Sequence, residues 1–314
     1  MPDAVLTRAR PLVLDGGLAT SLEARGHDLS GALWSARLLT DDPDAIVAAH
    51  RAYFLAGADV ATTASYQASF TGFAAHGIGP EQTVRLLRRS VSLARSARAA
   101  LTDGRRRWIA ASVGPYGAAL ADGSEYRGRY GLTVGELAAW HRPRMEVLAS
   151  AGADVLALET IPDADEAEAL VGALDGLAMP AWLSYSVAGE RTRAGQPLTE
   201  AFAVVADAPQ VVAVGVNCCD PVDVAPAIAA AREVTGKPVI VYPNSGEGWD
   251  AVGRRWTGRS RFSATDAARW VSLGAAGVGG CCRVGPAEIA AVARVLQGAA
   301  GGAAGANCPH DQLS

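Results

Sequence analysis

Short apolar runs alternate with alanine-rich amphipathic stretches along most of the chain. The runs are almost continuously hydrophobic and end in Gly, Ser, Thr or another polar residue, which is typical of strands buried in a parallel sheet. The predicted strands are Pro11–Gly17, Val60–Tyr66, Trp108–Pro115, Val155–Ile161, Ala181–Val187, Val211–Cys218, Val239–Gly246 and Gly277–Cys282. The predicted helices are Asp44–Ala56, Glu81–Leu101, Val134–Ala151, Asp163–Leu177, Glu200–Ala206, Pro221–Val234, Ala264–Leu273 and Pro286–Leu296.

Eight strand–helix units in a chain of 314 residues predict an α/β protein with a single-domain (β/α)8 TIM barrel. The alternative is an open, doubly wound sheet. It is disfavoured because Asp15-Gly16-Gly17 follows the first strand in place of a Gly-x-Gly-x-x-Gly motif. We expect residues 1–10 to form an N-terminal extension, residues 11–297 the barrel, and residues 298–314 a flexible Gly/Ala-rich tail.

Composition narrows the choice of partners and compartment. Half of the residues are hydrophobic, so the chain can bury a large core, and the net charge of −4 comes with no basic stripe for nucleic acid. No secretory h-region and no apolar run of membrane-spanning length is evident, so we expect a cytoplasmic protein that does not bind membranes. Lys237, the only lysine, lies in a predicted turn, which argues against a Schiff-base aldolase of the phosphate-binding barrel type.

The cysteines carry the strongest chemical signal. Four of the five form two adjacent pairs, Cys218-Cys219 and Cys281-Cys282, an arrangement that does not suit a disulfide framework. Three thiolates from two strand ends could hold a soft metal and leave a fourth position open, as in catalytic zinc sites. Adjacent side chains point to opposite faces of a strand, so a three-thiolate site and buried structural thiols both remain open at this point. For Cys219 we expect a structural role.

Polar residues gather where the predicted strands end, which is the active-site face of a barrel. Asp15 and Glu159 are either structural, as caps or salt bridges, or a carboxylate pair for a substrate ammonium group. The insert Asp122–Tyr126 after the third strand is expected to shape the pocket. Four histidines, His27, His50, His76 and His141, show no metal-ligand spacing, so we do not expect them to bind a metal. We expect the same of the two tail residues, Cys308 and His310.

A set of segments, in order along Pro11 to Leu296, resembles the homocysteine S-methyltransferases that use S-methylmethionine or S-adenosylmethionine. The segments are Asp15–Gly17, Thr63–Gln67, Ser112–Gly117, Asp122–Gly128, Gly215–Cys218, Tyr242–Glu247 and Gly279–Arg283. Each one alone is modest evidence, and their combination is highly specific.

The resemblance implies a TIM barrel that binds Zn2+ through Cys218, Cys281 and Cys282. It also implies that Asp15 and Glu159 hold the homocysteine amino group. Three further residues are expected to line the substrate site: Ser112, Tyr116 and Asn217. The expected partners are homocysteine and a sulfonium methyl donor, with no catalytic group beyond the zinc-activated substrate thiolate. The resemblance leaves open a betaine- or selenohomocysteine-using relative, and the cysteines alone leave open a non-catalytic zinc- or redox-sensing barrel.

Overall fold

Eight parallel strands form the central sheet in a computed structural model, which describes residues 10–29, 34–250 and 255–303. In sheet order they are β1 (Leu12–Val13), β12 (Ala275–Val278), β9 (Val239–Tyr242), β8 (Val211–Asn217), β5 (Ala181–Tyr185), β4 (Val155–Ile161), β3 (Trp108–Val113) and β2 (Val60–Thr62). A parallel bridge between Leu14 and Val60 joins the two ends of this series. The sheet is therefore closed, and the predicted TIM barrel is confirmed over the open doubly wound sheet.

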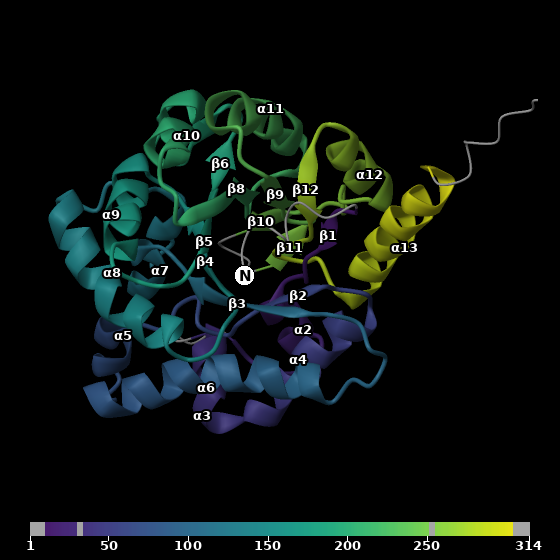
Figure 1. Cartoon of the computed structure of the whole chain (residues 1–314). Helices are drawn as coiled ribbons and strands as arrows, with labels where there is room; N and C mark the ends of the chain where they lie inside the picture. Colours follow the sequence, from purple (N-terminus) through teal and green to yellow (C-terminus); the bar gives the residue numbers. More distant parts are fainter. Residues whose placement is uncertain (1–9, 30–33, 251–254, 304–314) are drawn as a thin grey trace, which may run out of the picture.

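Helices surround the barrel, as Figure 1 shows in a view along its axis. They are α2 (Leu18–Glu23), η1 (Trp34–Arg37), α3 (Leu38–Asp41), α4 (Pro43–Leu55), α5 (Phe70–Ala74), α6 (Pro80–Ala99), α7 (Tyr116–Leu120), η2 (Ser124–Tyr126), α8 (Val134–Ala149), α9 (Ala164–Leu174), α10 (Leu198–Ala206), η3 (Pro221–Asp223), α11 (Val224–Thr235), α12 (Ala264–Ser272) and α13 (Pro286–Ala303). Two antiparallel ribbons lie outside the barrel sheet: β6 (Val187–Ala188) with β7 (Arg191–Thr192), and β10 (Gly248–Asp250) with β11 (Arg255–Thr257). None of the described helices is long and apolar enough to cross a bilayer.

Several predicted boundaries are wrong at the ends of elements. The first strand ends at Val13 rather than Gly17, and the last ends at Val278 rather than Cys282. In both cases the polar residues after the strand turn out of the hydrogen-bonded ladder and build the rim of the barrel. At the other end of the chain, helix α13 continues to Ala303, into the segment for which we expected a flexible tail. Cys308 and His310 lie outside the described residues.

Two layers of apolar side chains enclose the sheet. The inner layer fills the barrel with residues that alternate along the strands, and three large aromatics, Trp108, Trp182 and Tyr242, dominate it. Trp182 Nε1 donates to the Tyr242 hydroxyl at 3.0 Å, so the polar atoms of these two rings are paired inside the barrel. The outer layer lies between the strands and the helices. Because the barrel interior is packed, substrate access is limited to the rims.

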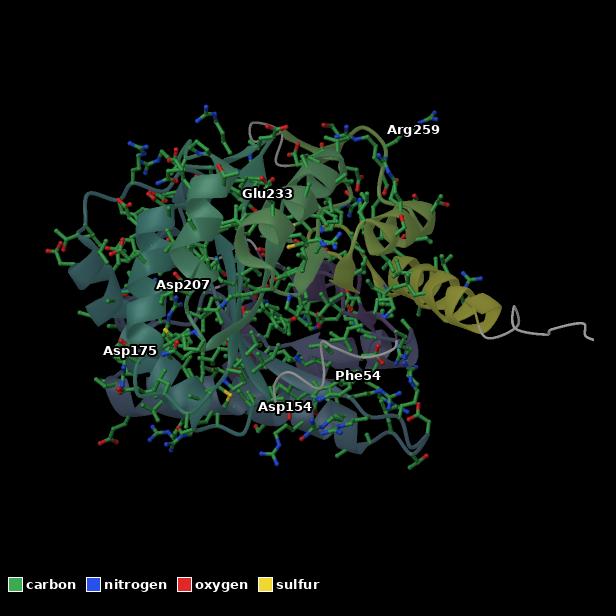
Figure 2. All side chains as sticks on the ribbon, turned by 45° about the horizontal axis from the view of Figure 1, so that its top comes forward. Phe54, Asp154, Asp175, Asp207, Glu233 and Arg259 are labelled. Carbon is green, nitrogen blue, oxygen red and sulfur yellow. The ribbon has the colours of Figure 1, made fainter. Side chains whose placement is uncertain are left out.

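Charged residues at the amino ends of the strands are paired with one another. Asp59, fully buried before β2, accepts hydrogen bonds from Arg10 at 2.7 and 2.9 Å and from Arg105 at 3.1 Å. Asp154, before β4, bonds Arg98 at 3.0 Å. Figure 2 shows the other polar side-chain tips gathered mainly around the outside of the ring of helices. The carboxylates at the amino-end rim therefore have arginine partners, whereas Asp15 and Glu159 at the carboxyl-end rim have none among the described residues.

Candidate metal centre and substrate pocket

Three thiols converge at the carboxyl-end rim of the barrel. The sulfur atoms of Cys218 and Cys282 are 3.8 Å apart, those of Cys281 and Cys282 are 4.0 Å apart, and all three lie within 4.8 Å of one another. Zinc with Zn–S bonds of about 2.3 Å places tetrahedral sulfur ligands about 3.8 Å apart. The thiol geometry therefore fits a zinc ion with three protein ligands, and it forms the one such cluster of His, Cys, Asp or Glu side chains found among the described residues.

The adjacent cysteines reach one point because they lie beyond the strand. After β12 the backbone of Gly279 approaches β1 so closely that an added Cβ would lie 2.6 Å from Leu14 Cβ. The chain then turns, and the amide groups of Cys281 and Cys282 donate to Pro243 O at 2.8 Å and to Asn244 Oδ1 at 3.0 Å. The two cysteines therefore lie in a turn after the strand, and strand alternation does not apply to this pair.

Cys218 reaches the cluster through an unusual backbone conformation. It follows β8 with φ of +51°, in the left-handed region that non-glycine residues rarely occupy. The Tyr126 hydroxyl lies 3.0 Å from its sulfur. Hydrogen bonds with Cys281, Cys282 and Tyr126 hold the pKa of Cys218 well below its ordinary value, against the opposing effect of burial. Cys218 is therefore the thiol that ionises first, whereas its contacts raise the pKa values of Cys281 and Cys282. The thiolate is the form that binds metals.

Two buried carboxylates face the same pocket as the thiols. Asp15 accepts hydrogen bonds from the Thr62 amide at 2.7 Å and the Thr62 hydroxyl at 3.0 Å, and Glu159 accepts one from the Ser112 hydroxyl. Burial raises the pKa of Asp15 to about 8 and that of Glu159 to about 7. Their hydrogen bonds only partly offset that burial. A cationic group placed between them would favour the ionised forms.

A bulge at the end of β4 brings consecutive residues to the pocket. The register between β4 and β5 shifts between Leu158 and Ile161, and Thr160 has φ of +61°. Both Glu159 and Thr160 consequently line the pocket, which regular alternation would forbid. Asn217 holds this conformation: its Oδ1 accepts from the Thr160 amide at 2.7 Å, and its Nδ2 donates to the Thr160 hydroxyl at 2.7 Å.

The structure separates the five residues expected to bind substrate into two groups. Asp15 and Glu159 line the pocket, whereas Ser112, Asn217 and Tyr116 are not among its lining residues. Ser112 and Asn217 are buried behind the pocket. Ser112 hydrogen-bonds to Glu159, and Asn217 hydrogen-bonds to Thr160. The Tyr116 ring packs against two other aromatic rings, 5.2 Å from Tyr130 and 4.9 Å from Trp140, measured between centroids.

A buried polar cluster behind the pocket fixes the loop after β3. Arg144 donates to the Gly114 carbonyl and to His141 Nδ1, the latter at 2.7 Å. Because the guanidinium only donates, His141 is neutral with its proton on Nε2, which donates to Glu166 at 2.8 Å. The same Glu166 oxygen accepts from the Tyr116 amide at 2.6 Å. Both ends of the Gly114–Tyr116 turn are therefore anchored from helices α8 and α9.

The four histidines of the described residues lie away from the thiol cluster, and Cys219 has the expected structural position. None of His27, His50, His76 and His141 lines the pocket or belongs to the thiol cluster. Burial lowers the pKa of His50 to about 4, so its ring is neutral at pH 7. Cys219 is fully buried in the outer core, and burial raises the pKa of its thiol. Cys219 is thus confirmed as a core residue.

Sequence reasoning did not assign roles to several pocket residues. Tyr66 and Tyr242 were recognised only as parts of strand ends and of the segments that carry the resemblance, and nothing in the pattern pointed to Thr20. The insert after β3 does shape the pocket, as expected, through Glu125 and Tyr126. The full lining is Asp15, Gly16, Gly17, Leu18, Ala19, Thr20, Thr62, Thr63, Tyr66, Glu125, Tyr126, Glu159, Thr160, Cys218, Tyr242, Gly280, Cys281 and Cys282.

Comparison with known proteins gives one consistent answer. Residues 12–296 match the family model described as homocysteine S-methyltransferase. The chain is 45% identical to the homocysteine S-methyltransferase of Escherichia coli, over 92% of this chain and 96% of the relative. It is 44% identical to the homocysteine S-methyltransferase YbgG of Bacillus subtilis, over 91% of this chain and 95% of the relative.

A solved structure gives the same result at the level of the fold. The metallated form of the homocysteine methyltransferase MmuM from Escherichia coli superposes with a TM-score of 0.83 at 43% sequence identity. The superposition covers 92% of this chain and 97% of the other. Fold and sequence therefore agree over nearly the whole length of both chains.

Proposed function

The chain belongs to the homocysteine S-methyltransferase family and is an enzyme of that type, and we propose that it is zinc-dependent and takes its methyl group from S-methylmethionine or S-adenosylmethionine. The observation that carries the proposal is the convergence of three thiols and two buried carboxylates on one pocket at the carboxyl-end rim. The product of the reaction is methionine. The Ser112–Gly117 and Tyr242–Glu247 segments, which resemble the S-methylmethionine-using branch, support the choice of donor.

Cys218, Cys281 and Cys282 would hold the zinc ion. The sulfur spacings of 3.8 and 4.0 Å match the tetrahedral value, and three ligands leave one position for a further sulfur atom. A bound zinc ion would favour the thiolate form of homocysteine at neutral pH. The Tyr126 hydroxyl, 3.0 Å from the Cys218 sulfur, would help to orient Cys218 as a zinc ligand.

Asp15 and Glu159 would bind the homocysteine ammonium group. Both carboxylates line the pocket, both are almost fully buried, and no Arg, Lys or His of the described chain pairs with either. A bound ammonium would supply the missing positive charge and lower both pKa values. Thr62 and Ser112 hold the two carboxylates in place through their hydrogen bonds.

The methyl transfer itself needs no side-chain acid. One carbon–sulfur bond of the donor breaks as a new one forms to homocysteine, and the departing thioether is neutral, so it requires no proton. The protein's contribution is to align the two sulfur atoms and to keep the pocket largely free of water. The absence of a histidine from the pocket lining is consistent with this chemistry.

The test is methionine formation by purified, reduced, zinc-loaded protein supplied with homocysteine and one donor at a time. S-methylmethionine, S-adenosylmethionine and betaine are offered separately, with selenohomocysteine as a second acceptor. Turnover with a sulfonium donor supports the proposal and identifies the donor. Turnover with betaine alone refutes the proposed donor class. No methyl transfer by protein that retains zinc would instead support a non-catalytic zinc barrel.

A further inference from the structure

Glu125 places a third carboxylate in the pocket, and the chemistry above gives it no role. The residue is 8% exposed and lines the pocket. Within the described part of the chain, its buried Oε2 atom has no hydrogen-bond partner. No arginine, lysine or histidine of the described residues forms an ion pair with it. Asp15 and Glu159 differ, because each accepts a hydrogen bond from another residue, whereas the Glu125 carboxyl has a hydrogen bond from its own backbone amide. A buried carboxylate with so little compensation costs stability unless a cation reaches it.

Close packing fixes the position of Glu125. It lies in η2, and the backbone of Gly117 in α7 approaches so closely that an added Cβ would be 2.5 Å from the Glu125 nitrogen. The next residue, Tyr126, places its hydroxyl 3.0 Å from the Cys218 sulfur. Glu125 is therefore held on the loop that contacts the thiol cluster, whereas Asp15 enters the pocket just after β1 and Glu159 from β4.

We propose that Glu125 recognises the positive charge of the donor's sulfonium group. This inference rests on the proposed function, because it assumes a sulfonium donor. A sulfonium has no N–H group to donate, so its recognition depends on electrostatic attraction and on aromatic faces. Tyr66 and Tyr126 line the same pocket. The Arg193 guanidinium lies over the Tyr126 ring, 5.6 Å from its centroid, so Tyr66 is the ring assigned to the sulfonium. Homocysteine brings one ammonium group, for which Asp15 and Glu159 suffice. The donor carries an ammonium group as well as its sulfonium, and the sulfonium must lie nearest the thiol cluster, where the acceptor sulfur is held. Glu125 is assigned to the sulfonium because its loop contacts that cluster through Tyr126.

The charge changes during the reaction give this role a kinetic signature. The donor loses its positive charge when the methyl group leaves, so the attraction to Glu125 is present in the bound donor and lost in the neutral thioether product. An interaction that weakens toward the transition state improves donor binding without accelerating the chemical step. Removing the charge of Glu125 should accordingly raise the donor KM and leave kcat unchanged or slightly higher.

The experiment compares the wild-type enzyme with Glu125→Gln, which keeps the shape of the side chain and removes its charge. Glu168→Gln is the matched control, since the same substitution removes one negative charge at an exposed residue of α9 outside the pocket lining. Glu125→Asp restores the charge with a shorter reach. We expect Glu125→Gln to raise the KM of the sulfonium donor roughly tenfold while the homocysteine KM changes less than about twofold. Glu125→Asp should recover part of the loss, and Glu168→Gln should match the wild type.

A binding measurement by calorimetry on the zinc-loaded proteins separates charge recognition from a loss of loop structure. S-methylmethionine and methionine differ by one methyl group and the sulfonium charge. We expect Glu125→Gln to weaken S-methylmethionine binding and to leave methionine binding within about twofold. An equal loss for both ligands, or an unchanged donor KM, would overturn the inference. A wild-type enzyme that uses no sulfonium donor would refute the proposed function itself, and the calorimetric comparison would still decide whether Glu125 recognises the charge.

Discussion

Replacing Asp15 by asparagine should stabilise the folded protein while weakening homocysteine binding. Asp15 is 4% exposed, and burial raises its pKa from 3.8 to about 8. At pH 7 the unfolded chain therefore carries an ionised carboxylate that the folded chain keeps largely protonated. Asparagine is neutral in both states and can keep both contacts with Thr62, through its carbonyl oxygen to the amide and its amino group to the hydroxyl oxygen.

The size and pH dependence of the effect follow from the two pKa values. Each unit of pKa difference that is realised at a given pH is worth about 1.36 kcal/mol. At pH 7 the penalty on Asp15 reaches an upper limit of about 4 kcal/mol, since pH 7 lies about three units above the unfolded pKa of 3.8. Because the folded pKa is raised, the wild type has its full stability below pH 3.8 and loses it as the pH rises toward about 8. The advantage of the variant should therefore grow between pH 5 and pH 8 and then level off.

The assay is thermal or denaturant unfolding of both proteins without homocysteine from pH 5 to pH 9, beside calorimetric titration with homocysteine at pH 8. We expect a higher Tm for Asp15→Asn at pH 7 and an affinity for homocysteine lower by at least about tenfold, since a charge-assisted contact is lost. Glu159→Gln should show the same trend with a smaller gain, because its pKa rises only to about 7. A Tm difference that is negative, or that does not depend on pH, would refute the reasoning about burial. Unchanged homocysteine binding would remove Asp15 from the ammonium site.

The remaining predictions concern the thiols and the tail. Cys282→Ser should lose both zinc and methyl transfer, measured by metal analysis and methionine formation, and full activity in zinc-free protein would contradict the proposed role of the metal. Cys219→Ala should cost about 1 kcal/mol of unfolding free energy by removing a buried sulfur, with zinc content unchanged. A loss of zinc in that variant would mean that Cys219 takes part in the cluster. Removing residues 304–314, beyond the end of α13, should leave kcat and both KM values within about twofold, whereas a large loss would assign the tail a function.

The fold was predictable because it depends on repeated, local patterns. Eight buried apolar runs alternating with amphipathic stretches define strand–helix units, and each observed barrel strand overlaps one predicted strand. Hydrophobic burial needs only that each strand be apolar and each helix have one apolar face, and both conditions can be read along the chain. The ends of the strands were less predictable. The ladder of β1 stops at Val13, before the turn signal of Asp15-Gly16-Gly17, and nothing in the local sequence fixes that point.

Chemistry-bearing residue types also stood out in the sequence. The adjacent cysteines and the polar strand ends pointed to a metal site at one rim, and the order of the motifs pointed to the family. Such signals identify candidate site residues when those residues belong to a recognisable set of motifs. They do not show how the residues lie relative to one another, and the doubt about two adjacent cysteines on one strand could not be resolved from spacing.

Only the tertiary structure decided the geometry of the site. Cys218 and Thr160 adopt left-handed backbone conformations, and Asn217 stabilises the one at Thr160 through contacts between β8 and β4. Glu125 enters the pocket because its loop packs against α7, a contact that no periodicity encodes. Local sequence preferences determine which segments become strands and helices. Strained residues, bulges and buried unpaired charges depend on contacts between segments far apart in the chain, so only the folded structure reveals them.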